Sequence, residues 1–257
     1  MLTFKKTNIV FVTMLALWLV FRVTVGAPLL FLFALLFVYS LLIFYGSYYI
    51  GSGFFFDVIC SGDTSEKKIA LSFDDGPVAE QTSAILHLLQ HHNISAAFFC
   101  IGKRIQGNEA IVNSIHQQGH LIGNHSYTHA FDFDFYPAKK ILNDLQQMDE
   151  TLKPILPLKP RFFRPPYGVT TPGMKRAIES GNYIPIGWNI RSMDTVIHDE
   201  EKLFKKVSKA LKPGAILLFH DTGKVTLAVL PRLIEYALGK GYQFVRLDKL
   251  INKEAYA

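Results

Sequence analysis

The chain has 257 residues, a hydrophobic fraction of 49% and a formal net charge of +6. This length accommodates one large domain together with a separate apolar segment. The basic residues are spread along the chain, whereas nucleic-acid binding needs a concentrated basic surface, so the composition argues against nucleic acid as a partner.

Residues 1–56 are expected to form a membrane segment. Between residues 7 and 56 the only side chain charged at neutral pH is Arg22. Two apolar stretches, at about residues 8–25 and 27–50, each approach the roughly 20 residues that cross a bilayer as a helix. They predict two transmembrane helices and make the lipid bilayer an expected partner.

A signal peptide is the alternative for the first stretch, because Lys5 and Lys6 precede an apolar region. No small-x-small cleavage site precedes the second stretch, which would anchor the chain in either case. Two spans would return the following domain to the side of Lys5 and Lys6, and the positive-inside rule assigns that side to the cytoplasm.

A polar linker is expected at residues 57–67, followed by one folded domain over residues 68–257. In this domain short apolar runs alternate with amphipathic segments. The runs are IALSF, AAFFC, HLIGN, RFF, YIPIGWNI, AILLF and YQFVRL. The helix-length segments are residues 80–90, 108–118, 137–153, 172–180, 200–211 and 225–240. This alternation predicts a parallel α/β sheet, either closed as a barrel or open.

Polar residues that directly follow the apolar runs are candidates for a functional site, because α/β folds place their sites at the carboxyl ends of the strands. Each of these residues is a poor choice for packing, so the sequence predicts that they share one rim of the sheet. They are Asp74, Asp75, His125, His129, Arg164, Tyr167, His220 and Asp221.

His125 and His129 are four residues apart, a spacing that on a helical turn directs both imidazoles to one side. Two histidines and one carboxylate make a catalytic zinc site with an open position. The alternative for this spacing is a pair of loop or core histidines that are satisfied by hydrogen bonds. The adjacent Asp74 and Asp75 strengthen the prediction of a metal site, because one carboxylate can complete the metal shell while the other accepts a proton from the attacking water. The sequence DDGP also suits a simple turn.

Four motifs, SFDDGP, HSYTH, RPPYG and LLFHD, occur in this order. In order and spacing they resemble those of the NodB-like polysaccharide deacetylases, carbohydrate esterase family four. The resemblance covers about residues 69–250. It implies a distorted (β/α) barrel of the NodB-homology type that hydrolyses N-acetyl groups on amino sugars with a divalent metal, commonly zinc, with cobalt or nickel as alternatives.

The resemblance also implies a role for each reactive residue. Asp74 would be the general base and His220 the general acid, and Asp75, His125 and His129 would hold the metal.

The resemblance further implies which residues line the substrate groove and orient the reactive groups. Pro166 and Tyr167 would line the groove, and the Tyr167 N–H would help to form an oxyanion hole. Arg164 would orient a carboxylate, most simply Asp74. Asp194 would tune His220 or pair with Arg164.

One motif departs from the family pattern. In the sequence WNIRSMDT, Arg191 replaces an Asp and Thr195 replaces a Trp, while Trp188 and Asp194 remain. Trp188 suits a buried core aromatic at least as well as a sugar-stacking residue.

The leading functional hypothesis is a membrane-anchored deacetylase of a polysaccharide or peptidoglycan-type glycan, a hydrolase of a linear amide C–N bond. One alternative is a deacetylase or deformylase of a lipid-linked sugar precursor, which a cytoplasmic face would favour. The other is a non-catalytic glycan-binding membrane protein. The family resemblance favours an extracytoplasmic domain on a bacterial-type cytoplasmic membrane. Cys60 and Cys100 are expected as free thiols, with a disulfide as the alternative.

Overall fold

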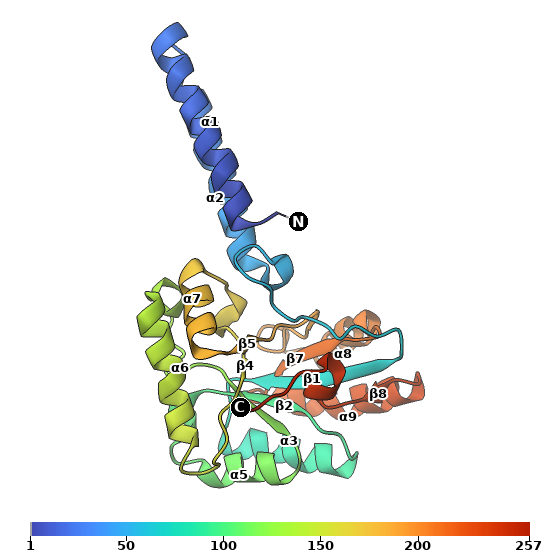
Figure 1. Cartoon of the computed structure of the whole chain (residues 1–257). Helices are drawn as coiled ribbons and strands as arrows, with labels where there is room; N and C mark the ends of the chain where they lie inside the picture. The colour runs from blue at the N-terminus through green and yellow to red at the C-terminus, as the bar shows by residue number, and fades with distance from the viewer. Residues whose placement is uncertain (1) are drawn as a thin grey trace.

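The computed structural model describes residues 2–257. Figure 1 shows a long helical hairpin that stands on a rounded α/β domain. The hairpin consists of α1 (Phe4–Val25) and α2 (Leu29–Tyr48). The chain reverses at Gly26, whose φ of 74° is the left-handed conformation that glycine adopts without strain. Tyr39 on α2 donates a hydrogen bond of 2.8 Å to the Asn8 side chain on α1.

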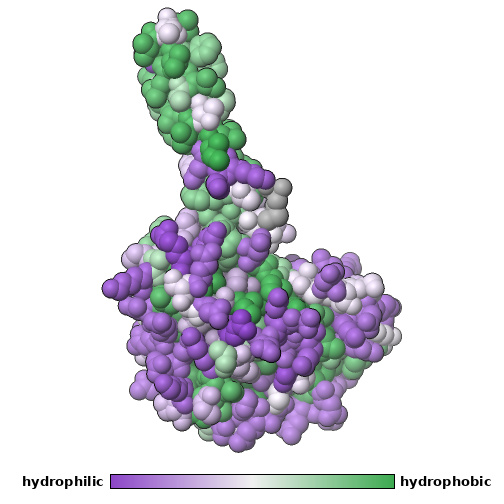
Figure 2. Space-filling view, in the orientation of Figure 1, coloured by the Kyte–Doolittle hydropathy of each residue, from purple (hydrophilic) through white to green (hydrophobic). Residues whose placement is uncertain are grey.

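Both hairpin helices are long and apolar enough to cross a membrane, judged by length and composition. The same properties also occur in signal sequences. Figure 2 shows the hairpin surface as almost wholly hydrophobic down to a hydrophilic band next to the domain. The backbone N–H of Phe4 donates to the Phe54 carbonyl oxygen (2.8 Å), so the start of α1 lies at the domain end of the hairpin.

The domain is built on a parallel sheet that has eight strands over the described part of the chain, in the order β5-β4-β3-β2-β1-β7-β6, with β8 also paired to β1. The strands are β1 (Lys68–Asp74), β2 (Ala97–Cys100), β3 (Leu121–Asn124), β4 (Phe162–Phe163), β5 (Ile184–Pro185), β6 (Ile190–Arg191), β7 (Ile216–His220) and β8 (Gln243–Phe244). Strand β1 lies between β2 and β7 and is buried on both faces, which explains its nearly continuous apolar sequence.

The sheet curls into a half-barrel whose two edges, β5 and β6, are not paired with each other in the described residues. The apolar run YIPIGWNI thus contains β5 and the start of β6 rather than one strand. At this seam, the gap in pairing between β5 and β6, Ile59 from outside the sheet pairs with Ile186, and its carbonyl accepts a hydrogen bond from Gly187 N–H (2.8 Å). The predicted distorted (β/α) barrel is confirmed.

Helices surround the sheet, and the six predicted ones occur within one residue of the expected bounds. They are α3 (Ala79–His91), α5 (Glu109–Gln117), α6 (Ala138–Leu152), α7 (Pro172–Gly181), α8 (Glu200–Ala210) and α9 (Lys224–Gly239). Five short elements were not predicted: the helices α4 (Gly102–Ile105) and α10 (Leu247–Ile251), and the 3-10 turns η1 (Ile50–Ser52), η2 (Phe133–Phe135) and η3 (Pro166–Gly168).

The segment expected as a linker, residues 57–67, runs along the domain. Besides the Ile59 bridge, Ser61 forms an isolated bridge with Ala215, the residue directly before β7. Cys60 in this segment and Cys100 at the end of β2 are both free thiols.

Candidate metal and catalytic site

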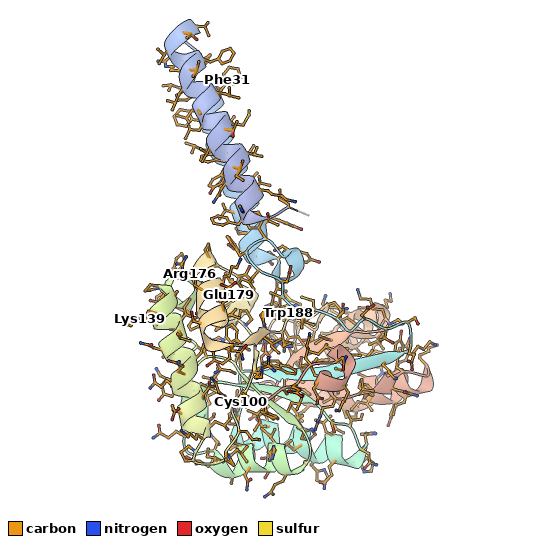
Figure 3. The ribbon with its side chains drawn as sticks, viewed as in Figure 1. Phe31, Cys100, Lys139, Arg176, Glu179 and Trp188 are labelled. Atoms are coloured by element: carbon orange, nitrogen blue, oxygen red, sulfur yellow. The ribbon has the colours of Figure 1, made fainter. Side chains whose placement is uncertain are left out.

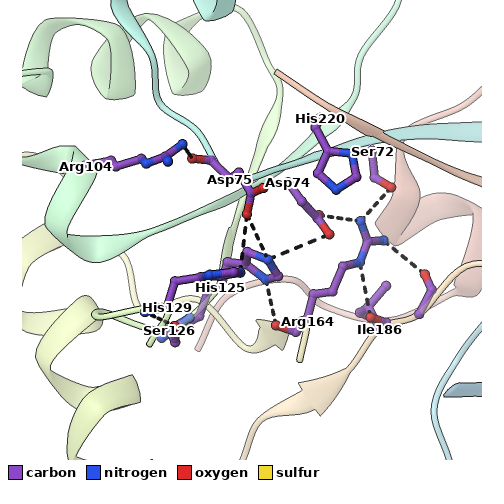
Figure 4. A network of polar contacts seen from close by, with 12 residues as sticks. Ser72, Asp74, Asp75, Arg104, His125, Ser126, His129, Arg164, Ile186 and His220 are labelled. Atoms are coloured by element: carbon purple, nitrogen blue, oxygen red, sulfur yellow. Dashed lines mark hydrogen bonds and ion pairs between the residues drawn. The ribbon is translucent and has the colours of Figure 1, made fainter. Parts of the chain in front are cut away.

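The register of the parallel strands brings the candidate residues to one rim. Asp74, the last residue of β1, is paired with Phe99 of β2 and His220 of β7. Asn124, which ends β3 directly before the HSYTH motif, is paired with Phe163 of β4, directly before Arg164. Figure 4 shows Asp74 between the histidine pair on one side and His220 on the other.

Asp75, His125 and His129 form a compact group of metal-ligand type. The Oδ1 atom of Asp75 lies 3.5 Å from His125 Nε2 and 3.4 Å from His129 Nε2. One ligand atom from each residue lies within 4.8 Å of the others. The two imidazole rings are 4.9 Å apart between centroids.

Hydrogen bonds from the surrounding chain orient this group. His125 Nδ1–H donates to the Arg164 carbonyl oxygen (2.8 Å), which leaves Nε2 free to act as a ligand. The backbone N–H of His129 donates to Ser126 Oγ (2.9 Å). Asp144 on α6 accepts hydrogen bonds from Tyr127 N–H (2.6 Å) and from the Thr128 hydroxyl (2.7 Å), and so holds the loop that carries both histidines.

Strained backbone concentrates at the same place. Asp75, Ser126, His129 and Tyr167 have φ angles of 77°, 66°, 46° and 58°, in the left-handed region that non-glycine residues rarely adopt. Each such residue costs on the order of 1–3 kcal/mol and persists where the surrounding structure holds it, typically at functional sites.

The pKa shifts of Asp75 and His129 fit a metal site. Burial opposes ionisation of Asp75, but the hydrogen bond and charge of His125 outweigh it and hold the pKa of the Asp75 carboxyl well below its usual range. Burial, together with the charge of His125, lowers the pKa of His129 to about 4. Burial also opposes protonation of His125, but the charges of Asp74 and Asp75 raise its pKa. An ionised carboxylate and neutral imidazoles are the ligand forms that bind Zn²⁺, which would displace the His125 proton.

Asp74 is held by a buried arginine instead of joining the three-residue group. Its Oδ1 atom accepts a hydrogen bond of 2.7 Å from Arg164, whose side chain is fully buried. The same guanidinium donates to Ser72 Oγ (2.9 Å) and to the Gly187 carbonyl (3.0 Å) at the barrel seam. The other carboxylate oxygen, Oδ2, lies 3.9 Å from His125 Nε2 and so faces the candidate metal site.

His220 lies on the far side of Asp74 and pairs with Asp194. Its Nδ1 atom is 2.7 Å from Asp194 Oδ1, and its backbone N–H donates to Oδ2 (2.7 Å). The Thr226 hydroxyl donates to the same Oδ2 (2.6 Å). Asp194 was predicted to pair with either His220 or Arg164, and in the structure it pairs with His220. Burial opposes protonation of His220, but the hydrogen bond and charge of Asp194 outweigh it and raise the His220 pKa.

The predicted groove residues line the rim. Pro166 is buried, while Tyr167 is 47% exposed and donates from its hydroxyl to the His129 carbonyl (3.3 Å). Trp188 is half-buried and packs against Gly168, with the Arg191 guanidinium 5.6 Å from its ring.

A pocket of about 560 Å³ opens beside His220. Thr195, one of the two departures from the family pattern, lines it together with His198 and Lys224.

Sequence reasoning assigned no role to several residues that support the site. Ser72, Asp144 and Thr226 are ordinary polar residues without a motif, and only their tertiary contacts reveal them. Asp221 was a candidate only because it follows an apolar run, and no role was predicted for it. It is buried, accepts a hydrogen bond from Thr82 (2.6 Å), and burial raises its pKa to about 7.

Comparison with known proteins gives consistent matches. The sequence profile of the family described as Polysaccharide deacetylase matches residues 61–184. The peptidoglycan-N-acetylglucosamine deacetylase PgdA of Listeria monocytogenes is 30% identical over 190 residues, which are 74% of this chain but only 40% of PgdA. A peptidoglycan-N-acetylglucosamine deacetylase of Bacillus cereus is 31% identical over 195 residues, 73% of this chain and 89% of that protein.

Solved structures show the same fold. The Bc1960 peptidoglycan N-acetylglucosamine deacetylase superposes with a TM-score of 0.73 at 29% identity, over 78% of this chain and 95% of that one. BA3943 of Bacillus anthracis, a CE4 family pseudoenzyme, superposes with a TM-score of 0.70 at 25% identity, over 75% of this chain and 68% of that one.

The half-barrel and the Asp/His/His group at its rim define a class of metal-dependent hydrolases. Within that class, the chain belongs to the polysaccharide deacetylase family, as the four motifs predicted.

Proposed function

We propose that this protein is a metal-dependent hydrolase that removes N-acetyl groups from the amino sugars of a peptidoglycan-type glycan and releases acetate. The observation that carries the proposal is the arrangement of three potential metal ligands beside an Asp74 carboxylate and opposite His220. The names of the relatives support the substrate class.

A divalent ion, most simply Zn²⁺, held by Asp75, His125 and His129, would polarise the acetyl carbonyl and activate water. Asp74 accepts the proton of the attacking water on its free Oδ2, while Arg164 donates a hydrogen bond to Oδ1 and orients the carboxylate. The Tyr167 N–H supports the developing oxyanion. His220 then donates a proton to the leaving amine, which departs as a free amino sugar.

Membrane anchoring is part of the proposal. Helices α1 and α2 have 22 and 20 residues, long enough for the roughly 30 Å hydrocarbon layer. The domain would then share the side of Lys5 and Lys6, and the cell-wall substrates named for the relatives favour the outer face. A reporter fused after Ala257 tests this, because phosphatase activity without cytosolic fluorescence identifies an external domain.

Removal of metal provides the direct test of the deacetylase. We expect a chelator to abolish acetate release by the full chain from an N-acetylglucosamine oligomer, and a stoichiometric amount of Zn²⁺, Co²⁺ or Ni²⁺ to restore it. The ranking of the three ions would identify the preferred metal. A metal-loaded chain that released no acetate from acetylated oligomers or peptidoglycan fragments would instead favour the non-catalytic glycan-binding alternative.

Replacing Asp194 by asparagine is expected to move the alkaline limb of the pH–activity profile to lower pH. A general acid must be protonated, so activity falls as the pH rises through the pKa of His220. Asp194 raises that pKa through its hydrogen bond and its charge. In the Asp194→Asn variant the negative charge beside His220 is absent, so the pKa of His220 falls. Activity then declines at a lower pH on the alkaline side of the profile. An alkaline limb that stayed in place would show that His220 is not the titrating acid.

A further inference from the structure

The base of the hairpin is packed into the domain and is not tethered by a free linker. Thr170 is buried, and its N–H and hydroxyl donate to the carbonyl oxygens of Ser47 (3.0 Å) and Gly46 (2.9 Å) in the last turn of α2. The Phe54 ring lies directly against Gly46, where a side chain would not fit. These contacts fix the position of the domain along the hairpin axis and its orientation relative to the hairpin.

If α1 and α2 are inserted in a bilayer, this packing places one face of the domain at the level of the lipid phosphates. If the helices span the hydrocarbon layer, their domain ends lie in the headgroup region. Lys5 is in the first turn of α1, and α7 begins two residues after Thr170. Figure 3 shows Arg176 and Glu179 of α7 just below the base of the hairpin.

A pocket of about 710 Å³ opens at this junction, between the first turn of α1, the segment after η1 and α7. This volume is in the range of small-molecule sites, roughly 300–1,000 Å³. Part of its lining is aromatic: the Phe4 and Phe55 rings are 5.1 Å apart between centroids. Its charged lining residues are Lys5, Lys175, Arg176, Asp57 and Glu179.

The cations of this pocket are only partly neutralised. Lys175 lies 3.9 Å from Glu179, one turn further along α7. Arg176 and Lys5 have no carboxylate within ion-pair distance among residues 2–257, and both are exposed. Asp57 is exposed and lowers the positive potential. An unpaired guanidinium next to an apolar lining at headgroup level suits a phosphate group, which arginine can bind through two parallel hydrogen bonds.

We propose that this pocket, formed by α1, residues 53–57 and α7, binds the phosphate headgroup of a membrane lipid. The same chemistry comes from two sources, a phospholipid of the bilayer or the phosphate of a lipid-linked sugar. The second source would bring substrate near the rim: Tyr167 and Pro172 are five residues apart, so their Cα atoms lie within about 18 Å. The proposal rests on the membrane insertion proposed above and not on the deacetylase activity.

Binding without turnover tests the pocket. The full chain in a neutral detergent is titrated with dihexanoyl phosphatidylglycerol, and the melting temperature reports the affinity. We expect Arg176→Gln to weaken binding at least tenfold and Lys5→Gln/Arg176→Gln to weaken it further, because charge-assisted hydrogen bonds are lost. Asp57→Asn should tighten binding, since it removes a repelling charge.

Lys209→Gln is the matched control, because Lys209 is an exposed lysine on α8 that does not line the pocket. It should bind like the wild type. Equal weakening by Lys209→Gln and Arg176→Gln would mean that the lipid binds to diffuse surface charge, and would overturn the proposal, as would unchanged affinity in the Lys5/Arg176 variant.

A polyprenyl phosphate titrated in the same way distinguishes the two sources. Tighter binding than phosphatidylglycerol, lost in the Lys5/Arg176 variant, would support the pocket and identify a carrier lipid. If the polyprenyl phosphate and phosphatidylglycerol bind equally well, and both lose binding in the Lys5/Arg176 variant, the pocket is supported and its ligand is identified as bilayer phospholipid. Acetate release from a soluble oligomer is measured separately on the wild type, so failure of the pocket leaves the deacetylase proposal intact.

Discussion

Replacing His125 by alanine is expected to remove the bound metal and nearly all acetate release. His125 is buried, and its Nε2 lies 3.5 Å from Asp75 Oδ1 in the three-residue group. Loss of residues that merely orient a metal ligand costs about 10–100-fold in affinity or activity, so loss of a ligand should cost more than about 100-fold. Elemental analysis of the purified full chain should show about one metal per chain for the wild type and almost none for the variant.

The control for this experiment is His87→Ala, which removes an exposed histidine on α3, away from the group. It should retain both metal and activity. Metal retained in His125→Ala together with lost activity would assign His125 to the chemistry and not to the metal. Metal and activity both retained would refute the ligand assignment.

The sequence was informative where local pattern determines structure. The amphipathic segments predict the long helices because apolar spacing and glycine at or near the ends are local signals. The candidate site residues lie together because parallel strands bring their carboxyl ends to one rim, so Asp74 and His220 are neighbours although 146 positions separate them.

The features that the sequence did not predict depend on tertiary contacts. The run YIPIGWNI reads as one strand, but its two ends form opposite edges of the sheet, and Ile59 pairs with Ile186 in the stretch between them. Asp144 holds the histidine loop from α6, and Thr170 joins the rim to the hairpin. No periodicity in the chain records such pairings, because each consists of a few hydrogen bonds between distant segments.

Asp74 and Arg164 form a buried ion pair that contributes to the stability of the domain and to the proposed chemistry. Mutations can separate these two contributions. The Arg164 side chain is fully buried, and its closest carboxylate contact is the 2.7 Å hydrogen bond to Asp74. Removing one partner of such a pair leaves an uncompensated buried charge, at a cost of roughly 3–5 kcal/mol. Asp74→Asn should therefore lower the melting temperature of the domain by on the order of 10 °C, and loss of the general base should reduce acetate release by about 10²–10⁴-fold.

The double variant Asp74→Asn/Arg164→Met separates stability from chemistry. Arg164→Met alone leaves the Asp74 carboxylate buried without its cation, so each single variant contains one unpaired charge, while the double variant contains neither. We expect the double variant to lose less stability than the two single variants together, because directly interacting residues are not additive. Its activity should stay as low as that of Asp74→Asn, since the proton acceptor is still absent. Calorimetry of the full chain in detergent together with acetate release checks both quantities. Additive stability losses would mean that the pair is not energetically coupled, and substantial activity in either Asp74 variant would transfer the general-base role to another group.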